Sequence, residues 1–247
     1  MKIGNGTLGM GCGLHDGALV VSEHLQPAGD VAGVDVQSSV VVSIRLLACI
    51  QAAGDGQNVS QYGSDIISVL RAQSRLQALE FWMRNPDYLA NELLTEFEAS
   101  GERDLLKIVQ RIFNDREPDL RRLPMVRYLF GAFEPLDNAL AILRAADLVR
   151  IKRDGIPGGK IREHLYLLTV AGRDALDRLT SMAPELTWYR DRAAIVARVA
   201  GTQGGKALKD RQYLQAEYAG TALSHVIQPV TDRVLARLAT IMEGLGE

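Results

Sequence analysis

The sequence predicts a mainly α-helical fold with one small β-hairpin. From residue 65 onward, most segments carry apolar residues at alternating spacings of three and four, the period of a helix with one buried face. Residues 148–153 instead alternate apolar and basic side chains, the period of a strand. The chain has 247 residues, 47% of them apolar, which is enough for one large domain or two small ones with a sizeable core.

Charge is distributed unevenly along the chain. The net charge of −2 excludes a histone-like polycation and an acidic tail protein. Residues 1–100 have a net charge of −6, whereas residues 101–247 have a net charge of +4. A polyanionic partner is therefore expected to meet the second half of the chain.

Cysteine content and hydropathy indicate the cytoplasm. Cys12 and Cys49 are too few for a disulfide framework. Glycines interrupt the N-terminus where a signal peptide needs an apolar core. The longest apolar stretch, 40–50, is broken by Ser43 and Arg45 and falls short of the ~18–20 residues that span a bilayer. We expect no membrane association.

Residues 1–60 are rich in glycine and lack helical periodicity. Valine-rich pieces at 18–21 and 40–44 favour short strands or an extended arm. Residues 4–9 match G-x-G-x-x-G, but no strand precedes them and glycines follow where a helix must begin. The match therefore does not predict a nucleotide site.

Residues 61–99 are expected to form a pair of helices. From Asp65 the spacing predicts a first helix with the apolar stripe Val69, Ala72, Leu76, Leu79 and Met83. Asn85 suits an N-cap, and Pro86 suits the first position of a second helix. The stripes fit packing in a core or in a dimer.

Residues 100–182 are expected to form a winged helix-turn-helix. Apolar stripes and prolines predict three helices, at 102–114, 124–134 and 135–146. Two strands follow, Leu148–Arg153 and Ile161–Leu168, joined by the glycine-rich loop Asp154–Lys160. Thr169 can cap a further helix. Helix, helix, helix, strand, loop, strand, helix is the winged-helix order.

One motif resembles a family of regulators. Tyr166–Leu176 (YLLTVAGRDAL) resembles the Y-x-L-T-x-x-G-x-x-x-L segment that closes the wing in MarR-like and PadR-like regulators, and Ala145–Val149 stands where those proteins have E-A-G-L-V. The resemblance covers residues 103–182, about a third of the chain, and implies a winged helix. Asp147 replaces the usual glycine, a change the fold tolerates because aspartate can adopt a left-handed conformation.

Residues 183–247 are expected to be helical as well. Apolar spacing predicts helices at 188–199, 208–226 and 230–242. The winged helix is thus flanked by helices on both sides. Such helices build a dimer or a docking surface, and a monomeric helical cap gives the same pattern.

Basic side chains around the wing are the best candidate site. Guanidinium and ammonium groups on a protruding hairpin can contact phosphates of double-stranded DNA. On the third helix, Asn138 can pair with adenine and Arg144 with guanine, but Asp137 opposes a polyanion. This face fits shape-guided or nonspecific DNA contact, or a winged helix that binds protein. A solvated hairpin is the alternative interpretation. The wing residues of the candidate site are Arg150, Lys152, Arg153, Lys160 and Arg162.

No catalytic or zinc-binding motif stands out, so we expect a non-enzymatic protein without metal or cofactor. The first functional hypothesis is a dimeric DNA-binding transcription regulator. The second is a winged-helix accessory subunit of an ABC/SMC-like complex, condensin-like or of phage defence, which docks protein; residues 75–94 are similar to small middle subunits of such systems. An enzyme with an unrecognised site is the third.

Overall fold

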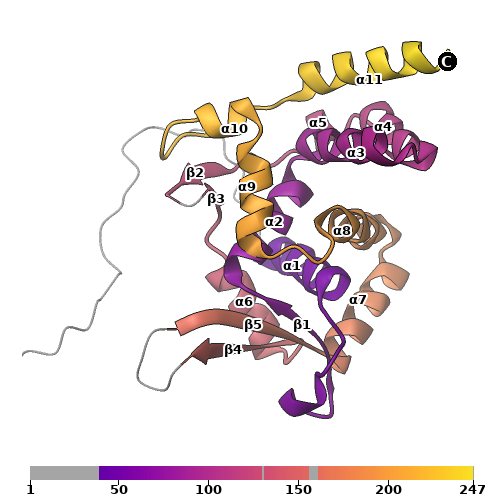
Figure 1. The fold of residues 1–247 in the computed structure, drawn as a ribbon. Coiled ribbons are helices and arrows are strands. Elements are labelled where there is room, and N and C mark those ends of the chain that lie inside the picture. Colours follow the sequence, from indigo (N-terminus) through magenta and orange to yellow (C-terminus); the bar gives the residue numbers. More distant parts are fainter. Residues whose placement is uncertain (1–38, 130, 156–160, 247) are drawn as a thin grey trace, which may run out of the picture. The chain divides into compact units, whose positions relative to one another are not determined.

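The fold is described from a computed structural model, for residues 39–129, 131–155 and 161–246 (Figure 1). The described residues all belong to one compact unit. The strand expected at 18–21 and most of the loop 154–160, including Lys160, lie outside the described residues. In the part of the chain that is described, no helix has the length and apolar character needed to cross a membrane.

Helices dominate the described residues, and the strands are few and short, so the predicted mainly α fold with a small β component is confirmed. The strands are β1 (Ile66–Arg71), β2 (Val126–Tyr128), β3 (Gly131–Phe133), β4 (Val149–Gly155) and β5 (Ile161–Thr169). The helices are α1 (Ser39–Ala53), α2 (Gln73–Arg84), α3 (Pro86–Ser100), α4 (Arg103–Asn114), α5 (Glu117–Leu120), α6 (Asp137–Ala145), α7 (Val170–Met182), α8 (Thr187–Ala200), α9 (Gly205–Tyr213), α10 (Ala216–Gly220) and α11 (Thr231–Leu245).

An antiparallel sheet has the strand order β1-β5-β4. The pairing expected between 148–153 and 161–168 is confirmed, with Ile151 opposite Tyr166. Strand alternation sends Tyr166 into the main core and Leu167 to the other face. That other face is not open to solvent, because Val59 and Tyr62 pack against it.

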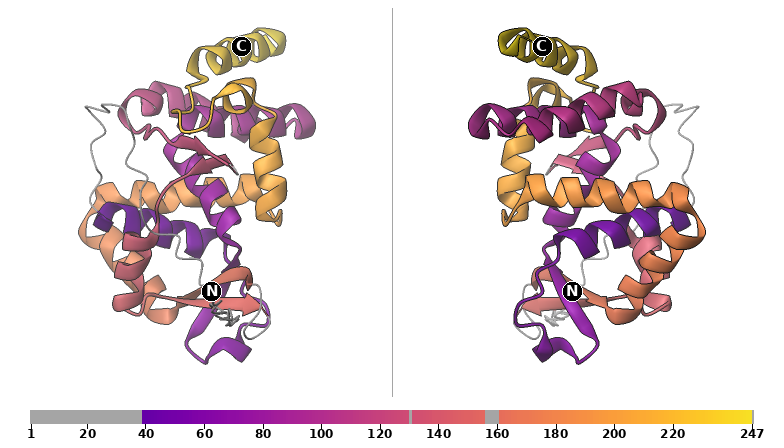
Figure 2. Two further views of the ribbon diagram at one scale, coloured as in Figure 1. Left: turned by 90° about the vertical axis from the view of Figure 1, so that its left-hand side faces the viewer. Right: turned by 90° about the vertical axis from the view of Figure 1, so that its right-hand side faces the viewer.

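Helix α1 is the central helix of the core. It packs against α6, α8 and α2, and Figure 2 shows it running alongside α8. The strand expected at 40–44 is therefore wrong. Leu46 and Ile50 are fully buried, and Arg45 donates to the buried Glu80 carboxylate of α2 at 2.6 Å. A helix buried on nearly all sides has no polar face, so its sequence shows no helical period. Its run of valines, which are common in strands, therefore predicted a strand.

Strand β1 replaces the first turns of the helix expected from Asp65. The neighbours Val69 and Leu70 are both buried, because each face of β1 is covered, and no apolar–polar alternation is left in the sequence. Ala72, with φ +69°, separates this strand from α2, which begins at Gln73. Helix α3 begins at Pro86 as predicted.

A β2–β3 hairpin occupies the place where the spacing predicts a helix at 124–134. Gly131 has φ +108°, a conformation that favours glycine and turns the chain. On the other side of β2, Arg127 N–H donates to the His225 carbonyl at 2.9 Å. This pairing also explains why no single helix covers 208–226: α9 ends at Tyr213, α10 is short, and the chain then lies beside β2.

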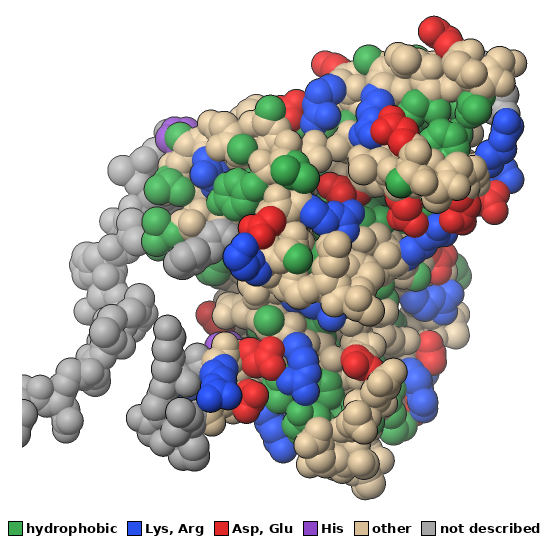
Figure 3. All heavy atoms as spheres, in the orientation of Figure 1, with side chains coloured by type: hydrophobic (Ala, Val, Ile, Leu, Met, Phe, Trp, Pro, Cys, Tyr) green, Lys and Arg blue, Asp and Glu red, His purple; other side chains and the backbone are tan. Residues whose placement is uncertain are grey.

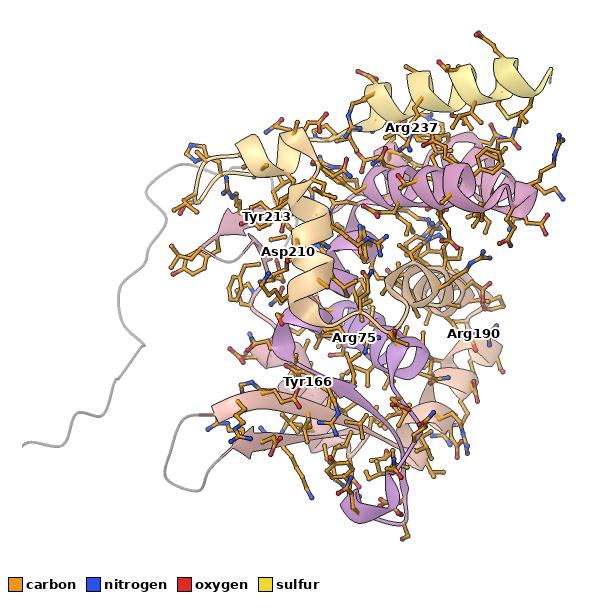
Figure 4. The ribbon with its side chains drawn as sticks, viewed as in Figure 1. Arg75, Tyr166, Arg190, Asp210, Tyr213 and Arg237 are labelled. Atoms are coloured by element: carbon orange, nitrogen blue, oxygen red, sulfur yellow. The ribbon has the colours of Figure 1, made fainter. Side chains whose placement is uncertain are left out.

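Helix α6 alone, of the three helices expected between 102 and 146, packs beside the sheet. Helix α4 forms as predicted but packs on α3. Helix α11 also lies on α3, where Arg237 reaches Asn91 and Glu98 at 2.7 Å each (Figure 4). Helix α6 packs on α1, and the sheet packs on α1 and α2, from earlier in the chain, and on α7.

The junction of α6, β4 and α7 explains the motif Tyr166–Leu176 and the segment Ala145–Val149 that stands with it. Asp147 is left-handed, with φ +51°, as expected for a substitute of glycine. The Thr169 hydroxyl accepts the Gly172 N–H at 3.0 Å and donates to the Asp147 carbonyl at 2.8 Å. A side chain on Gly172 would collide with the Leu148 carbonyl oxygen. Thr169 and Gly172 therefore lock α7 onto the turn that follows α6.

Candidate nucleic-acid interface

A groove of about 500 Å³ lies between α6 and the β4–β5 face of the sheet. Arg144 and Arg153 line it from the helix and from the sheet. The full lining comprises Asp137, Leu140, Ala141 and Arg144 of α6, Ile151 and Arg153 of β4, His164 and Tyr166 of β5, and Gln73 of α2.

Local periodicity places these side chains. Ala139 and Leu143 of α6 are buried, so the helix turns Ala141 and Arg144 toward the groove. On β4, alternation puts Arg153 on the same face as the core residue Ile151. The register places His164 directly opposite Arg153, so both project from the groove face of the sheet.

The groove arginines are available for a ligand. Most arginines in the described part of the chain bind a carboxylate or a backbone carbonyl. Arg144 and Arg153 are exposed and make no hydrogen bond or ion pair to the described residues. Their positive charge is therefore not neutralised within the structure described, and Figure 3 shows blue side chains over this end of the sheet, interspersed with carboxylates.

Asp137 and Tyr166 limit what the groove can bind. Burial, together with the Asp137 carboxylate, raises the pKa of Tyr166 to about 12, so its hydroxyl stays protonated. Tyr166 rises from β5 toward the helices in Figure 4. Asp137 also lines the groove, two helical turns before Arg144, and its carboxylate weakens the attraction for phosphate.

Arg150 and Lys152 lie on the opposite face of the hairpin from Arg153. The Arg150 guanidinium donates to Asp147 at 2.7 Å and to Asp65 at 3.0 Å, and these bonds hold the pKa of both carboxyls below its ordinary value. Lys152 stands over the Tyr62 ring, 5.4 Å from its centroid. Strand alternation thus divides the predicted basic wing between two faces.

The remaining candidate residues are placed less centrally. Asn138 is exposed on α6 but does not line the groove. Arg162 is exposed where the β4–β5 register shifts at the hairpin end, and Lys160 lies outside the described residues. Gln73, His164 and Tyr166 line the groove but were not predicted as site residues. The two-residue spacing from His164 to Tyr166 puts both on one face of a strand, and this is the signal that could have joined them to Arg153.

Among the described residues, no cluster of histidine, cysteine and carboxylate side chains could hold a metal ion. Comparisons with protein families, curated proteins and solved structures find no match for this chain. The geometry and charge of the groove are therefore the features that bear on function.

Proposed function

We propose that this chain is a cytoplasmic, non-enzymatic winged-helix protein that binds double-stranded DNA, most simply as a dimeric transcription regulator. The winged helix comprises α1, β1, α2, α6 and the β4–β5 hairpin, with residues 85–134 inserted between its second and third helices. The sheet order supports this assignment, since β1 joins the hairpin at β5 and α6 directly precedes β4.

The observation that carries the proposal is the pair of uncompensated arginines in the groove. Arg144 from the helix and Arg153 from the sheet converge on one cavity, with Arg162 exposed at the hairpin end. Guanidinium groups placed in this way contact phosphates along a duplex, and release of condensed counterions then favours binding. Asp137 in the same groove favours contact with the DNA backbone over reading of bases.

Duplex binding at two salt concentrations, about 50 and 200 mM, tests the proposal. Replacement of Arg144, Arg153 and Arg162 by Ala should weaken binding similarly for all sequences and reduce the salt slope by about one unit per lost phosphate contact. Arg111→Ala, an exposed arginine on α4, is the matched control and should bind like wild type. Absence of wild-type binding at low salt, or an unchanged triple variant, would overturn the proposal.

An accessory subunit of an ABC/SMC-like complex is the second candidate function. One observation favours it: large apolar side chains are exposed on the β2–β3 hairpin, as on a docking surface. Light scattering after size exclusion separates the candidates, because a regulator should be a stable dimer alone and a docking subunit should not.

A further inference from the structure

The β2–β3 hairpin presents a cluster of exposed apolar side chains, here called the hairpin patch: Val126, Tyr128, Leu129, Phe133 and Leu223. Their exposed fractions range from 39% for Val126 to 60% for Leu129. The Tyr128 and Phe133 rings lie 5.6 Å apart, and pairing of Ser224 with Arg127 brings Leu223 beside β2. Exposed apolar patches of this kind mark interaction sites.

A pocket of about 290 Å³ opens beside the hairpin patch. Tyr128 and Phe133 form one wall, and Lys209 of α9 lies at Gly131 of the hairpin, its stem near the glycine backbone. The other lining residues are Ala132 and, from α2, Gln73, Ser74 and Gln77. The space suits one leucine-sized or phenyl-sized group.

The backbone edges of the hairpin are already used. On β3, the Ala132 N–H donates to the Tyr218 hydroxyl at 2.6 Å, and the Glu134 N–H donates to Gln77 at 3.1 Å. On the far side of β2, Arg127 pairs with His225. A partner cannot add a strand here, so it must dock through side chains, as an amphipathic helix does.

Lys209 gives the hairpin patch a preference for a partner with an acidic side chain. Its ammonium group is partly buried, which lowers its pKa, and no carboxylate of the described residues lies within 4 Å of it. The acidic side chains that follow Lys209 in the sequence already form ion pairs with other residues. Asp210 pairs with Lys206 at 2.6 Å, and Glu217 pairs with Arg233 at 2.8 Å. Lys209 is therefore free to pair with a carboxylate of a partner.

A second copy of this chain does not supply that charge. In a two-fold contact centred on the hairpin patch, the same surface faces itself. The hairpin patch contains no carboxylate, so both copies of Lys209 would stay unpaired. A different protein fits better.

We propose that the hairpin patch docks an amphipathic helix of another protein, with one large apolar side chain in the pocket and an adjacent Asp or Glu carboxylate paired with Lys209 Nζ. The proposal does not depend on DNA binding, because none of these residues except Gln73 lines the α6 groove.

A displayed library of random helical peptides, selected on the full-length protein, tests the proposal. Enriched peptides should share an apolar stripe flanked by Asp or Glu. Their binding should fall about tenfold or more with Phe133→Ser and with Lys209→Met, as for hot-spot residues. Lys206→Met, on the same helix, should bind normally. Changing the peptide's acidic residue to Gln should weaken binding to wild type but not to Lys209→Met.

The variants must retain the wild-type circular dichroism spectrum; if Phe133→Ser does not fold, Leu129→Ser replaces it, since that side chain is more exposed. No enrichment, binders insensitive to Phe133→Ser (or to Leu129→Ser in its place), or equal affinity of acidic and Gln peptides for the wild type would overturn the proposal. A wild-type dimer that Phe133→Ser dissociates would also overturn it, in favour of a second copy.

Discussion

Gly172 shows how a single missing side chain supports the fold. A Cβ at this position would collide with the Leu148 carbonyl oxygen, at the turn where α6, β4 and α7 meet. Gly172→Ala should lower the free energy of unfolding by about 1–3 kcal/mol, because backbone or helix must shift to make room. Gly244→Ala, in an open position of α11, should instead stabilise by up to about 1 kcal/mol. Equal urea midpoints for Gly172→Ala and wild type would contradict this account.

Arg150 makes stability depend on pH in the acid range. Its hydrogen bonds lower the folded-state pKa of Asp65 and Asp147 below the ordinary value of 3.8. These bonds therefore stabilise the protein above about pH 4 and lose that effect as the pH falls through the lowered values. When urea unfolding is measured at a series of pH values from about 6 down to about 2, the free energy of unfolding should fall less steeply for Arg150→Gln than for wild type. Parallel curves would contradict the prediction.

Asp137 is expected to oppose the ligand of the groove. It lines the cavity with Arg144, and a carboxylate there repels phosphate. Asp137→Asn should therefore tighten duplex binding at low salt, with a smaller gain at high salt because screening weakens the repulsion. Anisotropy titrations at both salt concentrations measure the gain. Weaker binding by this variant would show that the carboxylate acts as a base-reading group.

At the scale of the element, the β4–β5 hairpin has two faces with different tasks. Arg153 projects to the groove, whereas Lys152 lies over Tyr62 on the covered face. Arg153→Ala should weaken duplex binding, and Lys152→Ala should leave it nearly unchanged. The two substitutions remove equal charge from adjacent residues, so net charge alone predicts equal effects. Equal losses in anisotropy titrations would contradict the division between faces.

Elements with a strong local pattern could be predicted from sequence. Helix α4 and the start of α3 at Pro86 carry clear stripes or stop signals, and the paired strands β4 and β5 flank a glycine-rich loop. Helix α1 and strand β1 are buried on both sides, which removes the polar face that identifies a period. The 126–133 hairpin depends on Gly131 and on pairing with residues about a hundred positions later, which no local window contains.

The same reason limits prediction of the site. Arg144 and Arg153 were predicted as candidates, but their convergence depends on the packing of α6 beside the sheet. Arg150 and Lys152 lie on the opposite face of β4 from Arg153. This separation follows from strand alternation and could have been predicted from the sequence. The partner of Arg150, Asp65, is 85 residues away and could not be anticipated.

At the scale of the whole described unit, distant segments assemble around one core. Helices α1 and α2 and strand β1 come from residues 39–84, whereas α6, β4 and β5 come from residues 137–169. The intervening segment carries α3, α4 and the β2–β3 hairpin. Helix α3 packs with α4 and α11, and the hairpin bonds to Tyr218 of α10, away from the sheet. The groove and the hairpin patch thus belong to different parts of the unit and can be tested separately.

Site-directed cross-linking to duplex DNA tests the central claim most directly. Ala141 is exposed and lines the groove, so a photoactivatable probe on Ala141→Cys should attach to bound DNA. The same probe on Lys107→Cys, exposed on α4, should not; both use a Cys12→Ser background, and Cys49 is buried. Cross-links from Ala141 alone, lost when Arg144 and Arg153 are replaced by Ala, are the predicted result. DNA binding with cross-links from Lys107 and none from Ala141 would contradict the account.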